Sequence, residues 1–420
     1  MSRPAIVKHA SPSQVVRLPR LTSARLYSDL SCFSYQIPPP PERAHAVKCI
    51  MAPVILFASL ASVCITSAAG DARMPNTCPT LVAASAVPSG TAPERPKEIA
   101  VQTIPLVASP PLQPQGKDEL SGLAWHKDYL ILLPELKHLN TVGASDGYLF
   151  RIAKADILDF LDGKSSLPLK IQRIPFRAAH ITKQINGYQG FEAIVFKDDR
   201  VYMTIEAEPG PDGRMMAYLV SGRIKPNSTE VQLDNEFIEL PPPAAVGNAS
   251  YESLMLMDNH LVSFFELNGA KIEKNHQGSP RGLAFSLSPR LAELEPIPIP
   301  NIEYRITDAT TADGDGKFWV INYYFPCEEG RNKYEIGIDA LAQTYGRGAT
   351  HAERKQVERL VEFQYVEQEG RIKLTKTPPI QLKLEDRPRN WEGLVRIDQR
   401  GFLIVTDEHP ETILGFVPYP

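Results

Sequence analysis

The 420-residue sequence has few cysteines and none of the spacings by which cysteine and histidine hold transition metals. No Cys-x-x-Cys pair is present, which argues against a zinc site. The Gly-x-Ser-x-Gly motif is also missing, which argues against a serine esterase. Acidic residues outnumber basic ones outside residues 1–50: this stretch carries seven Lys/Arg and two Asp/Glu, so the net charge of −4 leaves −9 for the rest. That balance argues against nucleic acid or an anionic membrane surface as a partner.

An uncharged apolar run lies near the N-terminus, over residues 49–69. Arg43 and Lys48 precede it, and the small residues Ser67-Ala68-Ala69 end it, as in a cleaved secretory signal. We therefore expect a signal peptide at about 45–69 and a secreted or periplasmic protein. A retained membrane anchor and a buried helix are the alternatives. The chain is then divided into a targeting region, a disordered linker and a folded domain, at 1–70, 71–96 and 97–420.

Two cysteines remain outside the targeting region, Cys78 and Cys327. An even pair in an exported chain predicts one disulfide, which would tie the N-terminal linker to a loop of the domain. Two unpaired thiols are the alternative.

A hairpin pattern recurs five times after residue 97. Each copy has a polar residue, an apolar run, a turn, a second apolar run and a second polar residue. The first polar residues are Ser121, Glu192, Glu252, Asp308 and Glu392, and the second are Glu135, Glu206, Glu266, Asn322 and Asp407. The first and second polar residues of a copy are 14 positions apart in four copies and 15 positions apart in the fifth. Two further strand-like runs follow each of the first four hairpins, so these repeats predict four strands each.

Repeated four-stranded units predict an all-β fold, a β-propeller. We expect five blades, with six as the alternative. The last unit has three strands before the chain ends, and residues 98–107 offer a fourth. An N-terminal strand would therefore close the ring and remove a free sheet edge. The long interval between the fourth and fifth hairpins predicts a helical insert around 336–360.

In a propeller the first strand of each blade lines a central channel, and the second runs antiparallel beside it. We therefore predict a channel mouth surrounded by the metal ligands Glu192, Glu252, Asp308 and Glu392, with Glu135, Glu206, Glu266, Asn322 and Asp407 in a second ring. Ser121 takes the place of the acid in the first unit, with Glu119 as a substitute. Like charges at ~4 Å repel by about 4 kcal/mol at an effective dielectric near 20, so a cation is expected. Oxygen ligands without Cys or His favour Ca²⁺. The alternative is that single acids accept backbone N–H bonds or pair with Arg or Lys.

The first-strand motif occurs as Ser121-Gly-Leu-Ala-Trp, Glu252-Ser-Leu and Asn390-Trp-Glu-Gly-Leu. It resembles the phytase-like propellers of the esterase-like activity of phytase family, and is more loosely similar to calcium-activated nucleotidases. The resemblance covers residues 118–420. It implies calcium at the channel mouth and an ester or phosphoester substrate. Two departures are Ser121 in the first unit and the missing Asp-Asp-Pro opening of alkaline propeller phytases.

These observations predict an exported, monomeric, calcium-binding propeller that hydrolyses phosphoesters or esters of small molecules. Substrate contacts are expected from the second ring and from cations on loops of the same face, namely Lys137, Arg331, Lys333 and Arg389. No catalytic residue is assigned. One alternative is a non-catalytic propeller with structural calcium that binds a small ligand, a glycan or a protein. The other alternative is a lactonase.

Overall fold

The computed structural model describes residues 95–108, 119–137, 145–246, 249–269, 281–287, 290–324, 336–407 and 409–420. The targeting region, both cysteines of the predicted disulfide, Arg331 and Lys333 lie outside these residues. Within them, no helix has the length and apolar character needed to cross a membrane.

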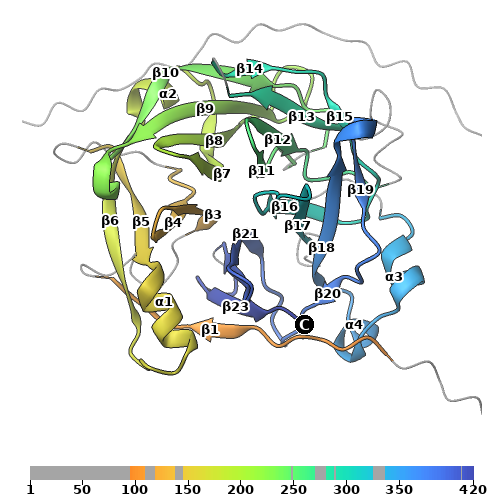
Figure 1. Ribbon diagram of the computed structural model, residues 1–420. Helices are drawn as coiled ribbons and strands as arrows, with labels where there is room; N and C mark the ends of the chain where they lie inside the picture. Colours follow the sequence, from red (N-terminus) through yellow and green to blue (C-terminus); the bar gives the residue numbers. More distant parts are fainter. Residues whose placement is uncertain are drawn as a thin grey trace, which may run out of the picture. The chain divides into compact units, whose positions relative to one another are not determined.

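The described chain has an all-β, propeller-like fold in which the strands fall into five groups of four antiparallel neighbours (Figure 1). The first group holds β3 (Leu120–His126), β4 (Tyr129–Pro134), β5 (Gly147–Ala153) and β6 (Leu169–Arg177). The second holds β7 (Tyr188–Lys197), β8 (Arg200–Ala207), β9 (Met216–Ile224) and β10 (Val231–Leu240). Parallel pairing of β10 with β6 joins these two groups at their outer edges.

The third group holds β11 (Ser253–Met257), β12 (His260–Phe264), β13 (Arg281–Ser286) and β14 (Ala292–Glu293), with β15 (Ile297–Pro298) also on β13. The fourth holds β16 (Arg305–Ala309), β17 (Lys317–Tyr324), β18 (Val357–Val366) and β19 (Arg371–Leu374), with β20 (Ile380–Gln381) also on β18. The fifth holds β21 (Trp391–Ile397), β22 (Gly401–Thr406), β23 (Leu414–Pro418) and β1 (Gln102–Ile104).

The first strands of the groups stand around a common centre. In Figure 1 these strands, β3, β7, β11, β16 and β21, are innermost, and each contacts the next, with β21 returning to β3. They enclose a cavity of about 110 Å³, to which every one of them contributes. The wall includes Leu123, Ile194, Leu254, Ala309 and Leu394. Most of the side chains that line this section of the channel are therefore apolar.

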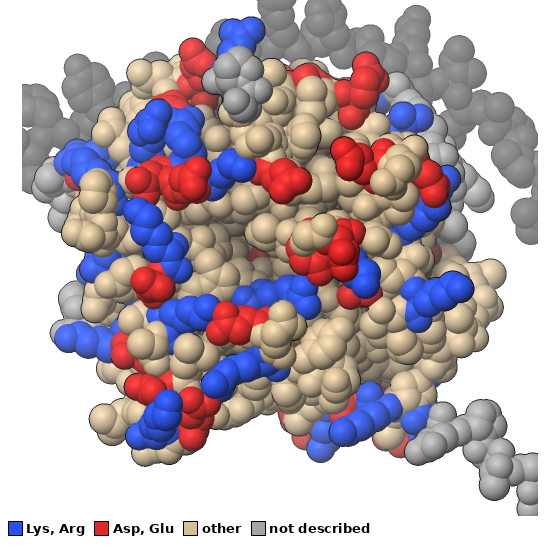
Figure 2. All heavy atoms as spheres, viewed as in Figure 1, with Lys and Arg blue, Asp and Glu red and all other residues tan. Residues whose placement is uncertain are grey.

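The core lies between the faces of neighbouring groups, because alternating apolar residues point to both sides of each sheet. Five of the buried clusters each join one group to the next, and one of these joins the fifth group to the first. In that cluster Leu123 and Leu130 pack with Val395 and Leu403. The outer surface is polar: basic and acidic side chains are interspersed over the face shown in Figure 2.

The N-terminal segment links three groups in succession. Ile99 forms a parallel bridge with Leu382 of the fourth group. β1 then pairs with β23, and β2 (Leu106–Ala108) pairs in parallel with β6 of the first group. The sequence predicts this strand as the fourth member of the last sheet, which is where β1 lies.

Helices are short and lie at the periphery. They are α1 (Lys154–Leu161), α2 (Ala179–Thr182), α3 (Ala340–Tyr345) and α4 (Ala349–Glu353), with 3₁₀ turns at Pro226–Ser228 and Glu367–Glu369. The helical interpretation of residues 336–360 fails at its end, because β18 begins at Val357. Val357 and Leu360 are buried in β18 against β17, and this pairing overrides the local helical pattern.

Candidate functional site

The hairpins share one backbone register at the end where their polar residues lie. Gly190 pairs with Glu206, and Ile306 pairs with Asn322. In the other hairpins the N–H groups of Glu135, Glu266 and Asp407 donate to the carbonyls of Glu119, Ser250 and Asn390. Each second polar residue therefore lies opposite the residue two positions before the first one. The predicted repeat is thus visible in the pairing of the backbone.

A feature that the sequence did not reveal is a β-bulge at the first polar residue. The register slips in four of the hairpins, at Ser121, Glu192, Asp308 and Glu392. A bulge places an extra residue in one strand and re-aims its side chain, and bulges are frequent beside active sites. In the remaining hairpin, Glu252 directly precedes β11.

Three of the predicted first-strand acids act on one another's charge. Burial raises the pKa of Glu252 well above its usual value, Glu266 raises it further, and Glu392 and Glu192 add to this against the lowering effect of Arg305. Burial likewise raises the pKa of Glu192, with contributions from the carboxylates of Glu135, Glu206, Glu392 and Asp407. The mouth therefore concentrates negative charge from several hairpins.

Arg305 is the cation inside this group, and the sequence did not single it out. The residue is 3% exposed. Its Nη2 lies 3.2 Å from Oε1 of Glu252, and its Nε donates to Oε2 of Glu266. Glu266 Oε1 accepts a second bond, from the N–H of Ser250 at 2.8 Å. In the sequence, the position of Arg305 at the start of an apolar strand could have indicated a buried ion pair.

One carboxylate oxygen remains without a partner. Glu252 is 8% exposed; its carboxyl group also shares a hydrogen bond with that of Glu266, and its Oε2 accepts no bond from a donor among the described residues. A buried acceptor left in this state costs about 1–3 kcal/mol. Glu252 is therefore the point in the mouth where a positive ligand would gain most.

A second group of carboxylates lies at the rim. One oxygen from each of Glu119, Glu135 and Asp407 lies within 4.8 Å of the others. Lys137 Nζ lies 2.9 Å from Glu119 Oε2 and 2.9 Å from Glu135 Oε2. This close approach needs a glycine at position 190, because a Cβ there would lie 2.4 Å from Cγ of Glu135.

The rim pair holds one proton. Burial and the hydrogen bond with Glu119 together raise the pKa of Glu135 to about 9, against the lowering effect of Lys137. Burial acts in the same direction on Glu119, but the bond from Glu135 and the charge of Lys137 bring the pKa of Glu119 below its usual value. At neutral pH Glu135 is therefore protonated and Glu119 is ionised.

Two predicted members of the rings have internal partners instead. Asp308 Oδ1 accepts from the N–H of Ala309 at 2.8 Å, and Oδ2 accepts from Leu394 at 2.7 Å, which fastens β16 to β21. Asn322 donates to the carbonyls of Glu303 and Arg305 and accepts from Arg359. Within the described residues, the four predicted metal ligands are not a set whose oxygens lie within 4.8 Å of one another.

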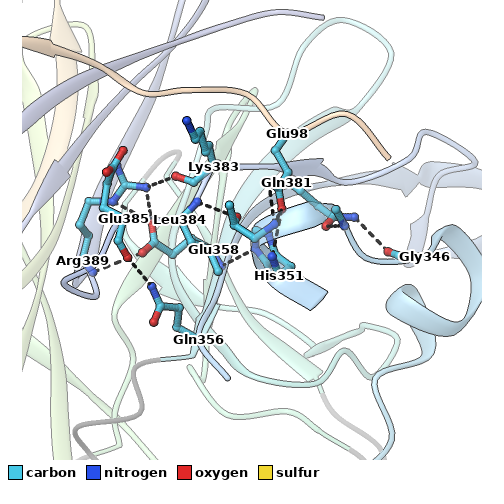
Figure 3. Close-up of polar contacts among 12 residues, drawn as sticks. Glu98, Gly346, His351, Gln356, Glu358, Gln381, Lys383, Leu384, Glu385 and Arg389 are labelled. Atoms are coloured by element: carbon cyan, nitrogen blue, oxygen red, sulfur yellow. Dashed lines mark hydrogen bonds and ion pairs between the residues drawn. The ribbon is translucent and has the colours of Figure 1, made fainter. Parts of the chain in front are cut away.

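Arg389, predicted as a substrate contact, is held by Glu358 (Figure 3). Its Nη2 lies 2.7 Å from Glu358 Oε2 and donates to the carbonyl of Lys383 at 2.8 Å. The indole N–H of Trp391 donates to the same Glu358 oxygen at 2.7 Å. Arg389 is 6% exposed and is thus part of the internal support of the mouth.

No family model matches the sequence, and no curated protein matches it either. Similar solved structures include a GH32 beta-fructofuranosidase of Bombyx mori (9% identity, TM-score 0.40, 76% of this chain and 61% of that chain). Others are a putative glycosidase of Bacteroides thetaiotaomicron (10%, 0.40, 78% and 94%) and a GH43 endo-arabinanase of Bacillus licheniformis (9%, 0.38, 71% and 93%). At these TM-scores the likenesses carry no argument about this chain.

Proposed function

We propose that the five strand groups are the blades of a five-bladed propeller and that its channel mouth is the site of a cation-dependent hydrolase. The observation that carries the proposal is the buried, unpartnered Oε2 of Glu252 in a group of mutually repelling carboxylates. Arg305 supplies one positive charge to Glu252 and Glu266 together, so the group stays negative. A bound cation would supply the missing partner.

The donor set favours Ca²⁺, because carboxylate oxygens are hard ligands and neither Cys nor His belongs to the set. Glu252 would hold the ion, and the negative charges of Glu192 and Glu392 on neighbouring hairpins would add to its attraction. Asp308 is left out because both of its oxygens already accept backbone N–H bonds. When bound, Ca²⁺ would supply a Lewis acid that polarises the group under attack.

The rim pair offers the proton transfers that hydrolysis needs. Ionised Glu119 would accept a proton from the attacking water, and protonated Glu135 would donate one to the leaving oxygen. Lys137, placed between them, keeps Glu119 ionised. Two carboxyl groups with opposite protonation states are a pattern that catalytic acid–base pairs share.

The charge of the mouth bears on the substrate. Lys137 contacts the carboxyl groups of Glu119 and Glu135, and Arg389 is bound to Glu358, so these predicted phosphate contacts are already engaged. An uncharged ester or lactone needs no such cation, whereas a phosphoester would enter a field of its own sign. We therefore place esters and lactones ahead of phosphoesters.

The test combines calcium binding with turnover. Full-length protein would be titrated with Ca²⁺ by calorimetry and assayed with p-nitrophenyl acetate, a γ-lactone and p-nitrophenyl phosphate, with Ca²⁺ or EDTA. We expect calcium-dependent ester or lactone hydrolysis that Glu252→Gln abolishes, and that Glu367→Gln on the exposed surface leaves intact. Absence of calcium binding to the wild-type protein would refute the proposal.

A non-catalytic propeller is the second candidate, and the engaged cations favour it as well. In that case Ca²⁺ would brace the mouth while the loops bind a ligand. Calcium binding that raises the melting temperature, without turnover of any of the three substrates, would select this candidate.

A further inference from the structure

A second hollow lies on the outer side of the molecule, between the second and third strand groups. Its volume is about 460 Å³, within the range of about 300–1,000 Å³ that is usual for small-molecule sites. β8, β9 and β10 form one wall, and Leu287, Arg290 and Leu291 form the other. Arg200 begins β8 and Glu206 lies near its end, so the hollow is about 20 Å from the mouth along this strand.

Three arginines line this hollow. Arg200 and Arg223 lie directly opposite each other on β8 and β9, and Arg290 faces them from the other wall. Like charges opposite each other on neighbouring strands are destabilising unless something offsets them. The opposed arginines therefore cost stability unless acidic groups lie beside them.

Partial compensation comes from one carboxylate. Asp234 Oδ2 lies 2.6 Å from Arg200 Nη2 and accepts a bond from Ser221 at 2.8 Å, which fixes the direction of the Arg200 guanidinium. Arg223 and Arg290 are exposed, and their side chains have no ion-pair partner among the described residues. Glu236 is the other acid in the lining. Because three arginines face two acids, the hollow has a net positive charge.

The remaining lining is apolar and partly aromatic. Tyr202 lies under the Arg200 guanidinium, at 5.9 Å from its ring centre. Phe237 is 38% exposed and packs edge-on against Tyr218 at 5.2 Å. An exposed aromatic ring beside unpaired guanidinium groups suits a ligand that has an acidic group and a flat apolar body.

We propose that this hollow binds a small organic anion, a carboxylate or a phosphate carried on a flat apolar body. Arg223 and Arg290 hold the acidic group, and Phe237 and Tyr202 contact the body. The hollow and the mouth do not share residues, so this site is independent of the proposed hydrolase.

The probe for the test is naphthalene-2-carboxylate, titrated calorimetrically into the full-length protein. Naphthalene-2-methanol serves as the neutral counterpart and acetate as the anion without a body. We expect one site for the naphthoate, and at least tenfold weaker binding of both counterparts. Arg223→Gln and Arg290→Gln should each weaken the naphthoate about tenfold, because each removes a charge-assisted hydrogen bond.

Arg371→Gln, at an exposed arginine on β19, is the matched control and should leave the affinity unchanged. Glu252→Gln should also leave it unchanged, which separates this site from the mouth. The melting temperature of each variant verifies folding. The proposal is overturned if the naphthoate shows no saturable binding at millimolar concentration. Equal binding of the neutral counterpart, or wild-type affinity in both arginine variants, overturns it as well.

Discussion

Glu252→Gln should stabilise the protein without calcium and destroy its response to calcium. The substitution keeps the shape of the side chain but removes a charge whose Oε2 has no partner and whose neighbours Glu266, Glu392 and Glu192 repel it. The amide that replaces this oxygen also carries donors, which the surrounding carboxylates can accept. A residue that binds a ligand is thus expected to lower stability in the ligand-free state.

The magnitude follows from the burial of that oxygen. Removing an unsatisfied buried acceptor should raise the free energy of unfolding by about 1–3 kcal/mol. The gain depends on pH. Because the pKa of folded Glu252 lies above the unfolded value, the folded state loses stability as pH rises beyond the unfolded pKa, and glutamine removes this loss. The gain should therefore be small at pH 5 and should increase toward pH 8.

Calcium should stabilise the wild-type protein far more than the variant. With a Kd of about 10⁻⁴ M, as in weak extracellular sites, 10 mM Ca²⁺ would stabilise the wild-type protein by about 2.7 kcal/mol. Glu252→Gln should gain less than about 1 kcal/mol on the same scale. Urea unfolding in EDTA and in calcium, followed by tryptophan fluorescence, measures both free energies.

Asp308→Asn is the matched control in the same ring. Both Asp308 oxygens accept backbone N–H bonds, and an amide would turn a donor toward one of these N–H groups. This variant should lose about 1–3 kcal/mol and keep its calcium response. If Glu252→Gln instead destabilises the EDTA form and still responds to calcium, the unpartnered oxygen does not mark a cation site.

Other predictions concern pH and the support of the mouth. Burial raises the pKa of Glu206 to about 7, so the calcium-free protein should lose stability as the pH rises from 5 to 7. The contribution of Glu206 to this loss is up to about 1.4 kcal/mol per pH unit. Urea unfolding at a series of pH values measures it, and constant stability would contradict the prediction. Glu98→Ala should lower the free energy of unfolding by about 2 kcal/mol, because the Glu98 carboxylate accepts hydrogen bonds from Nδ1 and from the backbone N–H of His351 (Figure 3). An unchanged midpoint of urea unfolding would contradict this. Gly190→Ala should displace Glu135 and lower the rate of hydrolysis. Gly314→Ala is the control, because Gly314 has open space around it, and this variant should keep the wild-type rate. Equal rates in the two variants would show that the position of Glu135 does not matter for hydrolysis.

Some of this structure could be predicted because strands alternate strictly. Polar residues 14 positions apart across a short turn return to the same end of a hairpin, and the observed register has this property in all the hairpins. The strand near residue 102 could be predicted as well, since the last unit lacked one. The metal-ligand assignment of Glu192, Glu252 and Glu392 stays a prediction, although Glu392 contributes to the raised pKa values of both Glu192 and Glu252.

The direction of each side chain could not be predicted, because it depends on the bulges. A slip in register turns the first polar residue out of the alternating pattern, and its new direction depends on the backbone torsions at that point. Asp308 thus meets the N–H groups of its own and a neighbouring blade, whereas Glu252 meets Arg305. The sequence pattern made these two acids equivalent, and the local backbone makes them different.

This difference also explains why the mouth can hold unfavourable charge. The stability of the ring comes from the apolar clusters between sheets and from the N-terminal segment, which joins the fourth, fifth and first groups. The acids of the mouth belong to none of these clusters, so like charges among them leave the packing between the sheets intact. Stability and binding therefore depend on different residues of the same strands. Isosteric substitutions such as Glu252→Gln can for this reason test the site without unfolding the propeller.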